Sequence, residues 1–545
     1  MARLLDNLEK YLIYLVLFWV PLAVLGVFAN PFEIPKVAVL IFGVTLLLFI
    51  FSLLALFKGS ATYSVFNFDL PVFLLGITYL VSGIAQTPNK MEAFLVPGTA
   101  SVIFFGAFFY LLLNHRAEAK KLIAPILTLT GAIASAVTLL AYSGVLTKVT
   151  FFPIFAQSVY FNLAGGYLPQ LLMLSVILPL SIGLILQEKE TIKKVFYAVS
   201  TLIIVGGVAL SIFNILPGQP GKPTLPPYQT SWSIAIDTLK TSPLLGVGPG
   251  NYLTAFNRLR PISSNQTDLW AVKFSTASSF ALTLITEVGL LGLAVFAFLV
   301  WQVVKIFKQK ENLFSLTSLA LSLIALFLLP GTTTLLFLFF VLLALNAKPG
   351  DKKLNLTLAT LPILLATLGI FYLAGRGFYG EYLYRNALSA LVANDGRTTY
   401  ETLGRTIKTN PYVDRYHASY SQVTIALARG LAQKETLTDE DKNIISQLIQ
   451  QAISEAKATA SLNPTRSANW EVLARTYQAI MPFAKGADQF AIQTFSQAVA
   501  LDPFNPNLRI ALGGVYYALG NYDEAIKVFA SAVTVKNDLA NAHYN

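Results

Sequence analysis

The sequence predicts an all-α protein in which a polytopic membrane domain is followed by an α-solenoid of helical repeats. The chain has 545 residues, of which 55% are hydrophobic and only 12% are charged. Its mean hydropathy of +0.62 is far above that of ordinary soluble domains. After Leu373 the apolar residues become periodic and polar residues fill the gaps between them. We therefore expect a membrane domain over residues 1–375 and a repeat domain over residues 376–545.

The membrane domain contains about eleven apolar runs, each close to the roughly 17–25 residues with which a helix spans a bilayer. The first run lacks a small-residue cleavage site, so we expect it to be retained as a membrane helix. The chain has no cysteine, which excludes disulfides, thiol catalysis and Cys-based metal sites. The runs cover residues 11–29, 37–57, 70–86, 99–114, 122–142, 168–187, 195–213, 280–304, 314–329, 332–347 and 356–373.

Lysines and arginines in the short loops predict the orientation of the chain. They gather in every second loop, for example around Arg116 and Lys193, and the intervening loops contain few. Because positively charged loops stay in the cytoplasm, the N-terminus is predicted to be cytoplasmic. An odd number of spans then puts the repeats outside, together with the long loop at 214–277. The net charge of +11 suits anionic lipid headgroups as partners and does not indicate nucleic acid.

A repeated pattern follows the membrane domain. Its most regular copy runs from Leu512-Gly513 to Ala525 and Ala532. This copy resembles the tetratricopeptide repeat, in which small residues let two antiparallel helices approach and large residues fill the space between them. Weaker copies precede it, so the region resembles about four hairpins, and we expect protein partners to bind there. Residues 540–545 match the opening of one more repeat, so the domain is expected to be truncated at its C-terminus.

The residues that can support chemistry lie in the long outer loop. An amphipathic helix is predicted over 231–241, where it would lie near the membrane surface. A proline ends this helix, three glycines form a turn, and an asparagine is placed to cap the next helix. A glycine turn before a helix start can bind an anion through its free N–H groups, so a phosphate cradle and a plain turn both remain open. This supporting loop comprises Trp232, Gly246, Gly248, Gly250 and Asn251.

Three cations and one carboxylate follow the glycine turn. Arg258 and Arg260 lie one helical turn later, and Lys273 lies just before the chain returns to the membrane. Guanidinium groups bind phosphate oxygens in pairs, whereas the alternative for all three cations is contact with lipid headgroups. Glu287 lies inside an apolar run but near its outer end, so it is a candidate for proton transfer or for a hydrogen-bonded structural role.

The stretch from Trp232 to Leu293 resembles the O-antigen ligase and O-antigen polymerase family of membrane glycosyltransferases. The resemblance rests on the Ser-Pro-Leu-Leu-Gly-Val-Gly-Pro-Gly-Asn-Tyr turn and on the Glu-Val-Gly-Leu-Leu-Gly block that begins at Glu287. It implies an undecaprenyl-diphosphate-linked oligosaccharide as donor, with its diphosphate held by the three cations. It also implies action on the outer face of a bacterial inner membrane in cell-surface polysaccharide biosynthesis, without metal or cofactor.

Two departures from the family pattern concern the active site. Members usually have a His-Asn pair nine residues before the Glu of the block, where this chain has Ser278 and Ser279. Serine has no proton affinity near neutral pH, so the usual general base is missing. Members also usually have an arginine four residues before the Trp, where this chain has Tyr228.

The leading functional prediction is therefore a ligase- or polymerase-like glycosyltransferase with a degenerate or rebuilt active site. In such a reaction the acceptor hydroxyl attacks the anomeric carbon while the lipid diphosphate leaves. The alternative of a different class is a non-catalytic, membrane-anchored repeat scaffold or a protein that binds lipid-linked glycans. A transporter would need charged residues deep in several spans, and the apolar runs contain almost none.

Overall fold

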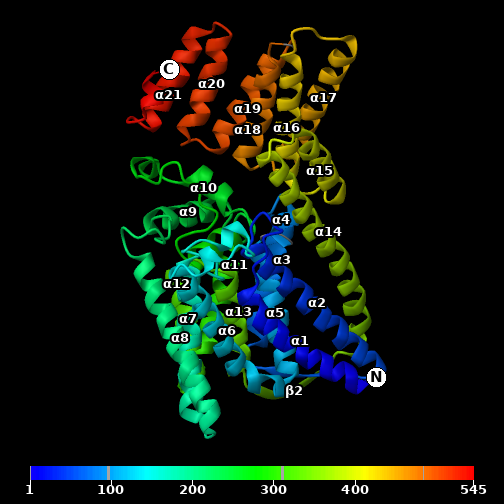
Figure 1. Cartoon of the computed structure of the whole chain (residues 1–545), viewed down its shortest axis with the longest axis vertical. Helices are drawn as coiled ribbons and strands as arrows, with labels where there is room; N and C mark the ends of the chain where they lie inside the picture. The colour runs from blue at the N-terminus through cyan, green and yellow to red at the C-terminus, as the bar shows by residue number, and fades with distance from the viewer. Residues whose placement is uncertain (1, 95–97, 309–311, 483, 545) are drawn as a thin grey trace.

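The computed structural model describes residues 2–94, 98–308, 312–482 and 484–544. A bundle of apolar helices forms one end of the molecule and the repeats form the other, with the outer loop between them (Figure 1). The bundle comprises α1 (Ala2–Leu22), α2 (Glu33–Lys58), α3 (Asp69–Ala85), α4 (Lys90–Phe94), α5 (Thr99–His115), α6 (Ile123–Tyr142), α7 (Tyr167–Gln187), α8 (Thr191–Ile215), α11 (Phe280–Phe307), α12 (Leu313–Leu328) and α13 (Thr333–Asn346). The loop comprises α9 (Tyr228–Thr241), α10 (Tyr252–Leu259) and the 3-10 turn η4 (Ile262–Gln266). The repeats comprise α14 (Thr360–Val392), α15 (Gly396–Thr409), α16 (Asp414–Ala432), α17 (Asp439–Leu462), α18 (Ser467–Ile480), α19 (Ala487–Leu501), α20 (Pro506–Ala518), α21 (Tyr522–Val535) and α22 (Ala540–Tyr544).

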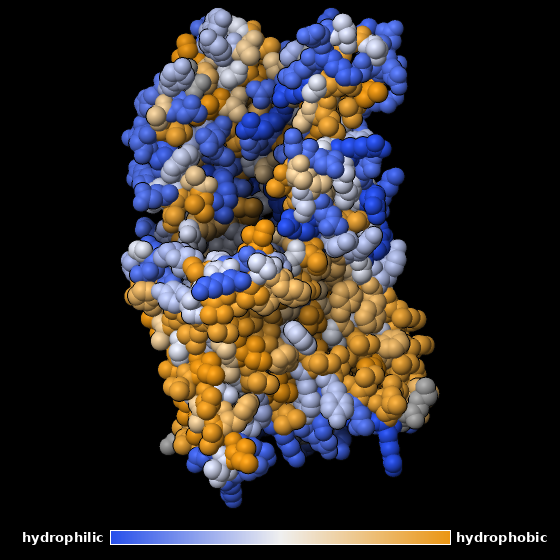
Figure 2. All heavy atoms as spheres, viewed as in Figure 1, coloured by the Kyte–Doolittle hydropathy of each residue, from blue (hydrophilic) through white to orange (hydrophobic). Residues whose placement is uncertain are grey.

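Among the described residues, seven helices are long and apolar enough to cross a membrane, and three shorter apolar helices lie among them. On the face shown in Figure 2, the bundle surface is a largely apolar belt, with hydrophilic residues at the far edge and over the repeats. The helix bounds follow the predicted runs closely for most of the bundle, as in α5, which covers Thr99–His115. The total of eleven spans stays a prediction.

The first helix differs from the run that predicted it. The apolar run covers residues 11–29, whereas α1 begins at Ala2 and ends at Leu22. In its charged first turns, Asp6 and Glu9 accept hydrogen bonds from Arg116, which stabilise this part of the helix. Hydropathy alone does not detect such a pair, because its partners lie about a hundred positions apart in the chain.

The centre of the bundle is α13, whose side chains from Thr333 to Ala344 are all buried. A helix that is apolar on every face belongs in the interior, and α5 and α7 pack around it. Gly106 lets α5 approach α13 closely, because a Cβ at this position would lie 2.4 Å from the ring of Phe340 on α13. This packing makes the bundle a rigid base for the loop above it.

The structure corrects the all-α prediction at the end of the bundle away from the repeats. Strand β1 (Thr62–Phe66) pairs antiparallel with β2 (Pro349–Asn355), which joins two loops almost three hundred residues apart. The sequence of β2, Pro-Gly-Asp-Lys-Lys-Leu-Asn, has no β-branched or aromatic residue and therefore lacks a strand signal.

One helix, α14, belongs to both parts of the chain. It runs unbroken from Thr360 to Val392, so the predicted boundary at residue 375 falls inside it. Its first half packs on α2, and its second half pairs with α15. The hairpins α16/α17, α18/α19 and α20/α21 follow, which agrees with the expected four helix pairs.

Replacing Ala525 with phenylalanine is expected to open the last hairpin. Ala525 and Ala532 are buried on α21, and Gly513 on α20 faces the ring of Phe529. Overpacking of this kind costs about 1–3 kcal/mol, so amide hydrogen exchange of α20 and α21 in the full chain should accelerate. Ala530→Phe, on the exposed face of the same helix, is the matched control. Equal exchange in both variants would show that the register of the hairpin is wrong.

Candidate functional site between the outer loop and the repeats

Helix α9 begins three residues before the predicted helix and has two distinct faces. Ile234 and Ala235 are buried against the loop core, whereas Trp232 is 58% exposed. The expected single apolar face is therefore divided, with Trp232 and Ile236 on the outside. An exposed tryptophan on a surface helix above an apolar belt is typical of a membrane interface.

The apolar helix that carries Glu287, α11, is broken. Gly289 has φ +68° and ψ −158°, which interrupts α11 and leaves backbone groups on both sides of the break without helical partners. The glycine turn supplies these partners. The N–H groups of Val247 and Gly248 donate to the carbonyls of Thr286 and Glu287, each at 2.9 Å. In return, Leu290 and Leu291 donate to the carbonyls of Pro243 and Leu244, at 2.9 and 3.2 Å.

The three glycines of the turn have a conformation that suits glycine, and two of them also permit this close approach. All three have positive φ, a conformation that disfavours any other residue. A Cβ on Gly246 would lie 2.4 Å from the Thr286 carbonyl oxygen, and one on Gly248 would lie 2.3 Å from the Thr87 hydroxyl. Because the N–H groups at 247, 248 and 250 already have partners in the protein, the geometry favours a turn over a phosphate cradle.

Glu287 also contributes to the contact between the glycine turn and the break in α11. Its Oε1 accepts the N–H of Gly250 at 2.9 Å, and its Oε2 is buried without a hydrogen-bonding partner among the described residues. Asn251 lies at the N-cap position of α10, as predicted, but its side chain donates to the Val247 carbonyl instead of capping the helix. Both side chains therefore hold the glycine turn closed.

The two serines at the family's His-Asn position lie just before α11. Ser279 is the N-cap, and its hydroxyl accepts the N–H of Leu282. Ser278 is 1% exposed, its N–H donates to Ser231 on α9, and its hydroxyl has no partner among the described residues. No basic side chain among the described residues contacts either hydroxyl.

The three cations predicted to hold a diphosphate separate into two groups. Arg258 is exposed at the end of α10. Arg260 is buried, and its guanidinium lies 2.7 Å from a carboxylate oxygen of Asp502, in the turn between α19 and α20. Lys273 donates to the other oxygen of Asp502. Burial lowers the pKa of Lys273, and the charge of Asp502 offsets part of that effect.

A second set of contacts extends the interface between the loop and the repeats. Asn265 donates to the carbonyls of Phe504 and Val535, at 2.8 and 3.1 Å. Lys536 donates to the Asn265 carbonyl at 2.8 Å and lies 5.0 Å from the centre of the Trp270 ring. The loop therefore forms a contact surface for the last two repeat hairpins.

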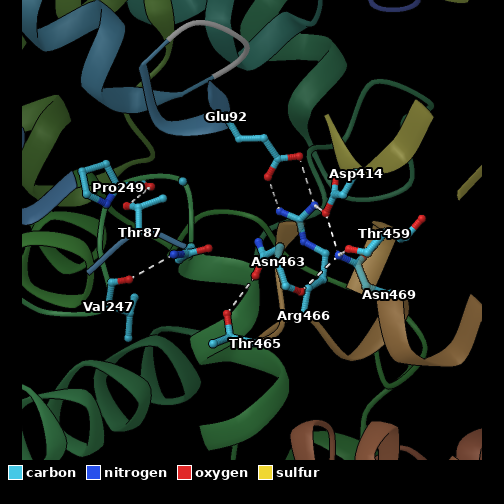
Figure 3. A network of polar contacts seen from close by, with 12 residues as sticks. Thr87, Glu92, Val247, Pro249, Asp414, Thr459, Asn463, Thr465, Arg466 and Asn469 are labelled. Carbon is cyan, nitrogen blue, oxygen red and sulfur yellow. Dashed lines mark hydrogen bonds and ion pairs between the residues drawn. The ribbon is translucent and has the colours of Figure 1, made fainter. Parts of the chain in front are cut away.

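The short helix α4 forms a separate contact with the repeats (Figure 3). Arg466, just before α18, donates to both oxygens of Glu92, at 3.2 and 2.7 Å. The same guanidinium donates to Asp414 at 2.8 Å, and Asn469 donates to that carboxylate at 2.8 Å. Burial alone would raise the pKa of Asp414, but the charge of Arg466 and the hydrogen bonds hold it below its usual value.

The α4 contact is continuous with the glycine turn. Thr87, three residues before α4, donates to the Pro249 carbonyl at 3.0 Å (Figure 3). On α3, the Ser82 hydroxyl contacts the carbonyls of Leu245 and Glu287, at 2.7 and 2.9 Å. The break in α11, the glycine turn, α4 and Arg466 therefore form one connected polar structure.

Sequence analysis missed the acidic half of these contacts. Glu92 and Asp414 lie in segments with no motif, and Asp502 precedes a proline as in many helix turns. Each of these carboxylates meets a cation that is distant in the sequence, so no local spacing could reveal them. Among the residues that the structure describes, no group of three or more His, Cys, Asp or Glu side chains is arranged to hold a metal ion.

Comparison with known proteins identifies the repeats only. The tetratricopeptide repeat family matches residues 488–544, and no curated protein matches the chain. The structure is similar to a thermophilic TPR protein of Thermus thermophilus, at 22% identity over 35% of this chain and 91% of that one, with a TM-score of 0.26. A monomeric IFIT1 mutant with Gppp-AAAA matches at 11% identity over 87% of this chain and 84% of that one, with a TM-score of 0.28. None of these matches supports the resemblance to the O-antigen ligase family.

Proposed function

We propose that this chain is a membrane-anchored tetratricopeptide scaffold that recruits protein partners at the outer face of a bacterial inner membrane. The observation that carries the proposal is the pairing of Arg260 and Lys273 with Asp502. Two of the three loop cations expected to hold a diphosphate instead form ion pairs with the repeats. Tetratricopeptide solenoids present extended surfaces for partners, and the loop and α4 fix this solenoid above the apolar belt.

The absence of cysteine in the chain permits a direct test of orientation. Tyr517→Cys on the repeats and Lys193→Cys at the other end of the bundle are both at exposed positions. In intact spheroplasts, a membrane-impermeant maleimide should label the first variant and not the second, because the positive loops are cytoplasmic. Labelling of only the second variant would reverse the topology and exclude an outer scaffold.

The same Tyr517→Cys variant tests partner binding. A benzophenone maleimide attached there should give a discrete cross-linked adduct with a protein partner in cells. Leu358→Cys, which is 94% exposed at the bundle end of α14, is the control and should give no such adduct. The same pattern of adducts at both positions, or none at either, would contradict recruitment by the repeats.

A second candidate function is transfer from a lipid-diphosphate-linked glycan. It is favoured by the exposed Arg258 on the loop and by the unpaired oxygen of Glu287 at the break of α11. With Glu287 as the proton acceptor, release of lipid diphosphate should fall about 10²–10⁴-fold in Glu287→Gln, while Ser278→Ala should have no effect. Turnover that collapses in Ser278→Ala would indicate a rebuilt nucleophile. If the wild-type chain releases no lipid diphosphate, only the scaffold function would remain.

A further inference from the structure

A lateral cavity of about 320 Å³ lies between α4, α5 and α14, at the end of the bundle nearest the repeats. Its size is within the range of pockets that bind small ligands, about 300–1,000 Å³. The walls are apolar, with one cation at the edge. The described residues that line it are Lys90, Met91, Phe94, Ser101, Phe104, Phe105, Ile370 and Leu373.

The polar groups of this cavity leave one charge for a ligand. The Ser101 hydroxyl is satisfied by the Phe94 carbonyl at 2.5 Å. Lys90 is exposed, its ammonium donates to the Thr87 carbonyl, and no carboxylate among the described residues pairs with it. The nearest carboxylate in the sequence, Glu92, is held by Arg466. An apolar space with an unneutralised ammonium at its edge fits an anionic amphiphile.

We infer that this cavity binds one acyl chain of an anionic phospholipid from the outer leaflet, with the lipid phosphate at Lys90. The inference rests on the membrane position proposed above, because the lipid must enter sideways from the apolar belt around α5 and α14. A zwitterionic lipid such as phosphatidylcholine would fill the same space but would gain little from Lys90, because its quaternary ammonium offsets the charge of its phosphate. The net negative charge of the headgroup is therefore the property that selects the ligand.

The lipid would also support the contact of α4 with the repeats. Met91 lines the cavity and packs against the buried cluster of the first repeat helices. Glu92, the next residue, holds Arg466. An acyl chain in contact with Met91 and Phe94 would fix α4 from the membrane side while the repeats hold it from the other.

Binding can be measured by titrating the purified full chain in detergent with dioleoyl phosphatidylglycerol, dioleoyl phosphatidylcholine or an isoprenoid phosphate and counting bound lipids by native mass spectrometry. We expect one tightly bound phosphatidylglycerol. Lys90→Gln should weaken it about fivefold, as expected for one lysine near a lipid phosphate, and should leave phosphatidylcholine unchanged. Lys90→Arg should keep the preference for the anionic lipid.

Matched variants separate this site from general lipid contact. Ile370→Trp fills the cavity and should abolish the tight site, whereas Leu368→Trp, exposed on the other side of α14, should retain it. Lys148→Gln, in another loop at the same end of the bundle, should also retain it. Equal binding in all variants, or a preference for an isoprenoid phosphate over phosphatidylglycerol, would overturn the inference. If no lipid of either class binds the wild-type chain, the proposed membrane position itself has failed.

Discussion

Replacing Arg466 with alanine is expected to release the repeats from the helical bundle. The change leaves Glu92 and Asp414 buried together without their cation, and their relative exposures are only 15% and 1%. Breaking a buried pair in this way costs about 3–5 kcal/mol. Amide hydrogen exchange should therefore accelerate strongly in α4 and in the turn before α18.

A pair on the surface of α18 provides the control for Arg466. Arg475 pairs with Glu471 four residues earlier, and their side chains are 55% and 31% exposed. Arg475→Ala should change exchange little, because exposed ion pairs contribute little to stability. A second variant, Glu92→Gln with Asp414→Asn and Arg466→Met, removes all three charges and should recover part of the loss. Normal exchange in Arg466→Ala would mean that the loop contacts alone hold the repeats.

Replacing Gly289 with alanine is expected to separate the glycine turn from α11. The φ and ψ angles of Gly289 lie in a region that is essentially restricted to glycine, and occupying it with another residue costs about 1–3 kcal/mol. A Cβ there would also lie 2.6 Å from the Leu244 carbonyl carbon and 2.8 Å from the Gly246 nitrogen. Both are backbone atoms, so no side-chain rotation can relieve the contact.

The expected result for Gly289→Ala is a lower thermal unfolding midpoint in detergent and faster exchange over residues 243–250. Gly369→Ala is the matched control, because a Cβ on that helical glycine meets nothing within 4 Å. Alanine is favoured over glycine in a helix by about 1 kcal/mol, so this control should be neutral or slightly stabilised. An unchanged unfolding midpoint and unchanged exchange over residues 243–250 in Gly289→Ala would show that the break in α11 is not needed to hold the glycine turn.

The helices were predictable because hydropathy and repeat periodicity are local properties. The run at 99–114 matches α5 almost to the residue, and the last repeat pattern matches α20 and α21. Pairing between distant segments was not predictable. The β1–β2 sheet depends on contacts between residues such as Thr62 and Asn355. The sequence of β1, Thr-Tyr-Ser-Val-Phe, is rich in β-forming residues, but β2 has none of them, so the sequence offers β1 no recognisable partner strand.

The sequence indicated which segment would form the candidate site, but not which residues would contact one another there. The spacing of the glycines indicated a tight turn, and all three do adopt positive φ. The sequence could not show that the N–H groups of this turn meet a broken helix, because Gly289 lies in a run that reads as continuous. Likewise, Arg260 was predicted as a cation that binds a diphosphate, and the sequence could not show its pairing with Asp502, which is more than two hundred residues away.

The unbroken helix α14 gives the molecule a mechanical property. Its 33 residues form a strut about 50 Å long, which begins next to β2 at one end of the bundle and ends among the repeats. Force applied to the solenoid by a bound partner is therefore carried along a stiff rod and not absorbed by a flexible linker. The Leu356 N–H, just before the helix, donates to the Ala61 carbonyl, so the load reaches the two-stranded sheet directly. Tension on the repeats would thus produce strain at the opposite end of the helical bundle.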